Sequence, residues 1–190
     1  ILGGIYPNEI EDLIKHNLST SLSNSVMASA ISKQAKCANK SVSVHIKVDT
    51  GMGRLGVQPD AFANLLDNVI TCKNLKIEGL FTHLSCADKE DPETTHHQIS
   101  IFSNVLKELL ATNSSKMINA NEDTLFHSAN TAGLLRFPES RFNLVRPGIS
   151  LFGSFPSPTI ASVFDSLAKE NKIDKLRPVM NWKTKIIQIQ

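Results

Sequence analysis

The residues best suited to binding a phosphate stand in two short segments in the second half of the chain. Asn130 and Thr131 offer an amide and a hydroxyl, and Gly148 and Ile149 offer backbone N–H groups. Such groups are the usual partners of phosphate oxygens, and a glycine lets a phosphate approach the main chain closely. The two segments therefore predict a phosphate-binding site, although Asn130 is equally suited to cap a helix.

Two arginines and one histidine complete the set of residues that could do chemistry: Arg54, Arg146 and His83. Because a guanidinium is planar and permanently charged, buried arginines suit a planar anionic ligand. We expect both arginines to be buried, and a phosphorylated cofactor with a charged substrate fits them and the phosphate site. His83 taken alone is equally compatible with a structural, hydrogen-bonded role.

Three other kinds of site find less support. Residues 50–53 lack the glycine spacing of dinucleotide-binding and P-loop motifs and favour a tight turn. Ser128 lacks the GxSxG turn of serine hydrolases. The grouped residues of metal-ligand type are Cys86, Asp88, His96 and His97. No ligand spacing repeats among them, so we expect no metal site.

Helical and strand patterns alternate along the chain. Apolar residues at helical spacing predict helices, and alternating β-branched runs predict strands. The predicted helices cover 7–16, 24–36, 59–69, 94–110 and 129–135, with 161–169 either a helix or a loop. The predicted strands cover 42–48, 75–81, 124–127, 142–145 and 179–190. This order is typical of an α/β protein with a parallel sheet, either open and doubly wound or closed into a barrel.

The unusual polar residues gather at the downstream ends of the predicted strands. The four clusters are residues 47–54, 82–83, 128–131 and 146–148. Ligands bind at the carboxyl ends of parallel strands in such folds. We therefore expect the clusters to meet at one edge of the sheet.

Composition excludes several classes of function. The 190 residues are 41% hydrophobic and 20% charged, with a net charge of +2, which argues against nucleic-acid or membrane-surface partners bound through bulk charge. Neither a membrane-spanning run nor a signal peptide is evident. Cys37, Cys72 and Cys86 are widely spaced, so we expect reduced thiols and a cytoplasmic protein. A start at Ile1 and an end inside a predicted strand suggest a piece of a longer protein.

Five segments in order resemble the alanine racemase family. They are 45–57 (HIKVDTGMGRLGV), 79–88 (GLFTHLSCAD), 127–139 (HSANTAGLLRFPE), 145–153 (VRPGISLFG) and 177–187 (RPVMNWKTKII). The resemblance implies a pyridoxal 5'-phosphate enzyme that interconverts L- and D-alanine for peptidoglycan and acts as a homodimer. It also implies an N-terminal (β/α)8 TIM-type barrel, incomplete here, over residues 1–176. Residues 177–190 would begin the connection to a C-terminal β domain.

The resemblance assigns roles to individual residues by motif. Arg146 would face the pyridine nitrogen of the cofactor, and His83 would hydrogen-bond Arg146 and hold it in place. Arg54 would contact the phenolic oxygen of the cofactor and the substrate carboxylate. Lys47 would be the lysine that is carbamylated in many members, and its negative charge would then fix Arg54. The phosphate site would consist of Asn130, Thr131, Gly148 and Ile149.

The two bases of the family have no counterpart in these 190 residues. Family members carry the Schiff-base lysine in a Lys-Ala-Asn-Ala-Tyr-Gly-type motif, which does not occur here, and their tyrosine base lies in the C-terminal domain. The single tyrosine of this sequence is Tyr6. We therefore expect an internal fragment of the barrel, inactive alone. A serine or broad-specificity racemase of the same fold and a non-catalytic pyridoxal-phosphate-binding barrel stay open as alternatives.

Overall fold

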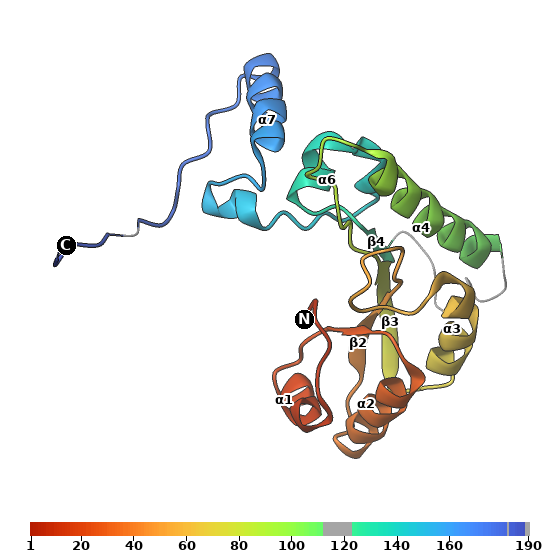
Figure 1. The fold of residues 1–190 in the computed structure, drawn as a ribbon. Helices are drawn as coiled ribbons and strands as arrows, with labels where there is room; N and C mark the ends of the chain where they lie inside the picture. Colours follow the sequence, from red (N-terminus) through yellow and green to blue (C-terminus); the bar gives the residue numbers. More distant parts are fainter. Residues whose placement is uncertain (112–122, 182, 189–190) are drawn as a thin grey trace.

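The centre of the molecule is one sheet of four parallel strands (Figure 1). The computed structural model describes residues 1–111, 123–181 and 183–188. The strands are β1 (Thr20–Leu22), β2 (Val42–Lys47), β3 (Leu75–Phe81) and β4 (Leu125–His127), and they lie side by side in that order. Each neighbouring pair is parallel, so the chain must return through a crossover after each strand. All four carboxyl ends therefore lie at one edge of the sheet.

Helices form the crossovers and cover one face of the sheet (Figure 1). Those that follow β1, β2 and β3 are α2 (Ser25–Cys37), α3 (Phe62–Ile70) and α4 (Glu93–Ala111). The other α-helices among the described residues are α1 (Ile10–Lys15), α6 (Thr131–Arg136) and α7 (Pro158–Asn171). Short 3-10 helices are η1 (Pro7–Glu9), η2 (Pro59–Ala61), η3 (Pro138–Ser140) and η4 (Ile149–Phe152).

Apolar periodicity explains why these segments pack as they do. The α4 helix buries Ile99, Phe102, Leu106 and Leu109, which share one side at helical spacing. Phe102, Leu106 and Leu109 join a core that includes Val44 of β2 and residues of α1, α2 and α3, whereas Ile99 belongs to a second apolar cluster that includes residues of α6 and α7. Full burial of one such side chain contributes about 1.5–3 kcal/mol, so this core fixes the positions of the strands.

The pairing of β2 with β3 contains a β-bulge that affects the positions of His45 and Glu78. Val44 pairs with Ile77, but the next residue, His45, pairs with Gly79, so Glu78 has no partner opposite it. An extra residue in one strand locally turns its side chain out of the alternating pattern. The Glu78 carboxylate thereby reaches the same face as the His45 ring, 3.2 Å from its Nε2.

The predicted strand over residues 142–145 is wrong. Phe142 has φ of +44°, which interrupts an extended backbone. The segment still runs beside β4, because the Asn143 amide N–H donates to Phe126 O and its side chain donates to Thr124 O. A side chain thus replaces part of the strand ladder, and the chain continues from there to Arg146.

Two further differences concern the ends of the chain. Strand β1 was not predicted. Residues 179–181 and 183–188, predicted as a strand, contain neither helix nor strand. Residues 161–169 lie within α7 and are helical. No helix in the part of the chain that the structure describes is long and apolar enough to cross a membrane.

Candidate functional site

The loop after β2 is shaped by one buried carboxylate. Asp49 Oδ1 accepts the backbone N–H groups of Gly51, Met52 and Gly53 at 3.0, 2.8 and 3.1 Å. Gly56 has φ of +132°, and a Cβ on it would lie 2.6 Å from the Asp49 backbone nitrogen, so only glycine fits there. The carboxylate and the glycine together fix the path of residues 49–57.

This loop presents Arg54 at the surface, so the prediction that Arg54 is buried is wrong. Asp49 satisfies the loop's backbone, and the turn carries the arginine outward from the sheet. Lys47, at the end of β2, is only 3% exposed, with its Nζ 5.4 Å from the centre of the Phe81 ring. Burial, followed by the charges of Arg54 and Arg146, lowers the pKa of Lys47.

The loops after β2 and β3 are joined by a buried amide that sequence reasoning missed. Thr50 Oγ1 and Thr82 Oγ1 lie 2.8 Å apart. Gln98 of α4 donates to Thr50 Oγ1 and to the His83 carbonyl, at 3.3 and 3.1 Å, and accepts from Ser85 N at 2.9 Å. The available signal was a glutamine placed on the apolar side of a helix, where a buried polar group needs partners.

Arg146 brings the loops after β3 and β4 together. Its guanidinium donates to Thr82 O at 2.8 Å and to Ser128 O at 3.1 Å, and also to His127 Nδ1. The histidine hydrogen-bonded to Arg146 is therefore His127, not His83 as predicted. The reason is position: His127 ends β4 directly beside the arginine, whereas His83 lies beyond the end of β3. Burial lowers the pKa of Arg146 to about 10.

Both histidines are uncharged at neutral pH. The pKa of His83 is lowered to about 4 by burial and by the nearby charges of Arg146, Lys47 and Arg54. The pKa of His127 is lowered to about 3, mainly by burial and then by Arg146. The two imidazoles are therefore neutral hydrogen-bonding groups of the site.

Of the four residues predicted to bind phosphate, Asn130 is already engaged. It caps α6 by accepting Gly133 N–H at 2.9 Å, and its amide donates to Leu84 O at 3.2 Å. The amide therefore positions the start of α6. Its contribution to a ligand would be through the backbone beside it.

Of the other three, Thr131 and Gly148 are bonded to each other, and Ile149 follows Gly148. Thr131 Oγ1 accepts Gly148 N–H at 3.1 Å and lies 3.3 Å from Ser150 Oγ. A Cβ on Gly148 would meet no atom within 4 Å, and Ile149 is 41% exposed, so this corner is open. The Gly148 N–H, predicted to bind phosphate, is therefore already bonded to Thr131, and the groups of anion-binding type at this corner are the hydroxyls and the Ile149 N–H.

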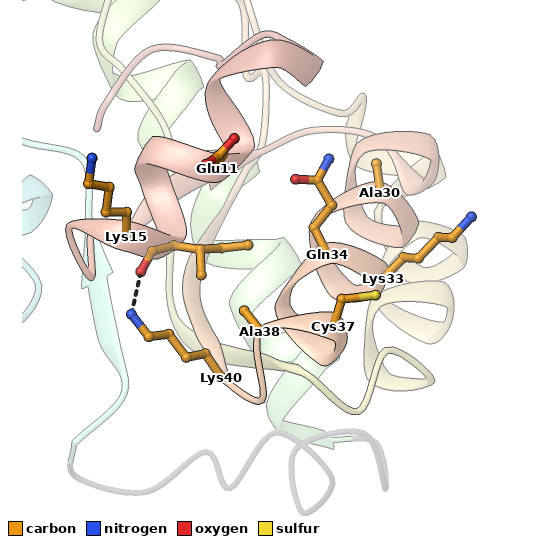
Figure 2. Close-up of a pocket in the computed structure, with 9 residues that line it drawn as sticks. Glu11, Lys15, Ala30, Lys33, Gln34, Cys37, Ala38 and Lys40 are labelled. Atoms are coloured by element: carbon orange, nitrogen blue, oxygen red, sulfur yellow. Dashed lines mark hydrogen bonds between the residues drawn. The ribbon is translucent and has the colours of Figure 1, made fainter.

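Two hollows lie away from this corner. One of about 250 Å³ is lined in part by His45, Phe81, His127 and Arg146. Another of about 770 Å³ lies between α1 and α2 (Figure 2). Its polar groups do not converge, because Lys40 Nζ is bound to the Ile14 carbonyl at 3.0 Å and the other lysines extend outward. None of the predicted site residues lines it.

Comparison with known sequences identifies a single family. Residues 1–156 match the family model described as the alanine racemase N-terminal domain. An alanine racemase of Halothermothrix orenii is 35% identical over all of this chain, which covers 46% of that protein. One of Carboxydothermus hydrogenoformans is 33% identical over all of this chain and 47% of that protein. The chain thus spans about half the length of the curated relatives it matches.

Solved structures agree with the sequence comparison. An alanine racemase of Clostridium difficile 630 superposes with a TM-score of 0.75 and 28% identity, covering 93% of this chain and 45% of that one. One of E. faecalis gives a TM-score of 0.71 and 30% identity over 84% of this chain and 41% of that one. The N-terminal domain of these proteins is a TIM-type barrel, so the predicted fold class is confirmed. The chain belongs to the alanine racemase family and matches its N-terminal domain.

Proposed function

We propose that this protein takes part in the interconversion of L- and D-alanine with pyridoxal 5'-phosphate, supplying D-alanine for peptidoglycan. The observation that carries the proposal is the gathering of Lys47, Arg54 and Arg146 at the carboxyl ends of the strands. Lys47 ends β2, Arg54 lies on the loop that follows it, and Arg146 donates to Thr82 O and Ser128 O, just beyond the ends of β3 and β4. Together they suit a ligand with several negative charges, such as a phosphorylated cofactor with an amino-acid carboxylate.

The corner around Thr131 fits the phosphate of such a cofactor. We assign the Thr131 hydroxyl, the Ile149 N–H and the open space at Gly148 to the phosphate, with Asn130 fixing the start of α6 beside them. Arg146 is assigned to the pyridine nitrogen. When bound, pyridoxal phosphate withdraws electrons from the substrate α-carbon and so makes its proton acidic.

Arg146 would act as a fixed hydrogen-bond donor. Its pKa of about 10 keeps it protonated at neutral pH, and two carbonyls and His127 hold its orientation. It would therefore hold its proton beside the ring nitrogen and leave that nitrogen neutral. His83, neutral and under the influence of Arg146, Lys47 and Arg54, would add polarity without charge.

Arg54 would bind the substrate carboxylate. It stands on a loop that Asp49 holds rigidly, and its exposed guanidinium is free to accept an anion in the bidentate geometry that arginine favours. The residues that move the α-proton in the family have no counterpart in this sequence. We therefore expect the 190-residue chain alone not to racemise alanine, and detectable turnover in a purified preparation would contradict this expectation.

The test is the Arg54→Ala variant of the full-length protein, assayed with both alanine enantiomers. Loss of one charge-assisted contact of about 1.5–3 kcal/mol should lower kcat/KM by about tenfold to a hundredfold. Gln58→Ala, an exposed change just beyond the same loop, is the matched control and should leave kcat/KM unchanged. An unchanged value for Arg54→Ala would contradict its assignment.

Assays with serine enantiomers test the substrate. A serine kcat/KM equal to or above that of alanine would favour a broad-specificity racemase of the same fold. Cofactor binding without turnover of any amino acid by the full-length homodimer would favour a non-catalytic pyridoxal-phosphate-binding protein.

A further inference from the structure

A row of hydrogen bonds crosses the sheet from Arg146 to Glu78. Arg146 contacts His127 Nδ1, and His127 Nε2 lies 2.9 Å from His45 Nδ1. His45 Nε2 lies 3.2 Å from Glu78 Oε2, which also accepts the Ser19 hydroxyl at 2.8 Å. The row links β4, β2 and β3, and it ends at a side chain that is 33% exposed.

The direction of each hydrogen bond follows from the chemistry of the two ends. A guanidinium can only donate, so His127 Nδ1 must accept, and the proton of this neutral ring must lie on Nε2. His127 Nε2–H then donates to His45 Nδ1, which leaves the His45 proton on its Nε2. That proton is directed at the Glu78 carboxylate, which can only accept when ionised. Both ends therefore demand the same tautomer of both rings.

Two backbone features make this row possible. The bulge at Glu78 turns its carboxylate toward His45, as the register shows. Gly79 lies between the two histidine-bearing strands, paired with His45 on one side and Leu125 on the other. A Cβ on Gly79 would lie 2.6 Å from His45 Nδ1 and 2.4 Å from Leu125 O. Because Gly79 has no side chain, the His45 and His127 rings have room to meet over β3.

We propose that Glu78 is a positioning residue for Arg146. It is the terminal acceptor of the row, and it holds His45 and His127 as neutral rings protonated on Nε2. Within residues 1–111, 123–181 and 183–188, no carboxylate forms an ion pair with Arg146. Hydrogen bonds connect Arg146 to the Glu78 carboxylate through the two imidazoles. Because hydrogen bonds in a chain polarise one another, the negative charge of Glu78 acts through both rings on the half-buried Arg146 guanidinium.

Protonation of either ring would break the row. A charged His45 would direct a second proton at His127 Nε2, which already carries one. The His127 ring cannot shift that proton to Nδ1, because Arg146 donates there. The pKa of both rings is also lowered, mainly because burial disfavours their charged form. The proposal concerns the side chains alone and does not depend on a bound cofactor.

The test is nuclear magnetic resonance of the chain with 15N-labelled histidine, without cofactor, between pH 5 and 8. Two-bond proton–nitrogen correlations report which ring nitrogen carries the proton, and His45→Gln and His127→Gln variants assign the two rings. We expect each ring in its neutral form to be protonated on Nε2 alone, and neither ring to gain a second proton near pH 6.5. A proton on Nδ1 of either ring, or titration of either ring near its ordinary value of 6.5, would overturn the proposal.

Variants of Glu78 test its role as terminal acceptor. Glu78→Leu should abolish the protected His45 Nε2–H signal and speed the exchange of the Arg146 guanidinium protons, whereas Glu78→Gln, which keeps an acceptor oxygen, should preserve both. Glu139→Leu removes a similar carboxylate from the surface pair with His96, 3.1 Å apart, and should change neither signal.

Unaltered signals in Glu78→Leu would overturn the role of Glu78. If that variant does not fold, Glu78→Gln still decides, because disappearance of its His45 Nε2–H signal would contradict an acceptor role that an amide oxygen can fill.

Discussion

Lys47 is a buried amine surrounded by more positive than negative charge. The nearest carboxylate that acts on it belongs to Asp49, whose oxygens already accept loop N–H groups. Burial and two arginines both favour the uncharged form of the lysine. An uncharged amine is a nucleophile, and addition to CO2 with release of one proton would convert it to a carbamate. The resulting anion would suit a site that otherwise holds only cations.

We therefore predict that Lys47 forms a carbamate in bicarbonate solution. With 13C-labelled bicarbonate near pH 8, the wild-type chain should show a carbamate carbon resonance that Lys47→Arg lacks. Exposed lysines such as Lys33 remain in both proteins and serve as the internal control. A resonance of equal intensity in Lys47→Arg would contradict the prediction.

At the scale of elements, the loop of residues 49–57 is the most constrained segment of the site. Its shape depends on the Asp49 carboxylate, which accepts successive backbone N–H groups, and on Gly56, which packs against the Asp49 backbone. Rigidity here matters because Arg54 has to meet a small substrate at a defined place.

Two glycines of this loop provide a matched pair of substitutions. Gly56→Ala should lower the free energy of unfolding by about 1–3 kcal/mol, because the new Cβ overlaps Asp49 in a backbone conformation closed to alanine. Gly53→Ala, at φ of +67° with nothing within 4 Å, should cost about 1 kcal/mol. Urea unfolding of the two variants measures the difference, and equal losses would contradict the steric argument.

Helices and strands with a regular apolar pattern could be predicted from the sequence, and those without one could not. Residues 75–81 were predicted as a strand and form β3 with the same bounds, and the prediction for 94–110 closely matches α4. These predictions are confirmed because alternation and helical spacing persist over several residues there. Residues 142–145 are apolar enough for a strand, but the positive φ of Phe142 is a tertiary outcome that no local pattern reveals.

The site itself was predictable in its residue types more than in its contacts. The motifs placed His83 and Arg146 at the ends of two predicted strands, but which histidine meets the arginine depends on the register of β3 and β4. Likewise, the bulge that turns Glu78 toward His45 has no signature in hydrophobic alternation. The burial expected for Arg54 failed because the turn at Asp49 directs the loop outward.

At the scale of the whole molecule, several histidines are folded in their neutral form. His127 is 1% exposed with a pKa of about 3, and His83 has a pKa of about 4, both below the ordinary value of 6.5. Above pH 6.5 both folded and unfolded chains leave them uncharged, so they do not affect stability. As the pH falls below 6.5, the unfolded chain binds protons that the folded chain excludes, and stability declines.

We therefore predict acid destabilisation that begins near pH 6 and continues toward pH 3–4. The slope of the unfolding free energy in this range should reflect about one proton for each buried histidine. His83→Gln should reduce that slope, because it removes one of the two rings that the folded chain keeps neutral. Thermal or urea unfolding at a series of pH values measures the slope, and a pH-independent wild type would contradict the prediction.

Gln98 has a consequence for motion. Its amide bonds simultaneously to the segments that follow β2 and β3, while its backbone belongs to the middle of α4. Neither segment can open separately without leaving a buried amide unsatisfied. The Ser85 amide N–H donates to the Gln98 side chain. In native-state hydrogen exchange, the free energy of opening measured at this amide should therefore equal the one measured for α4. The two segments and the helix would form one cooperative unit, so residues on both loops would keep their spacing through thermal fluctuations.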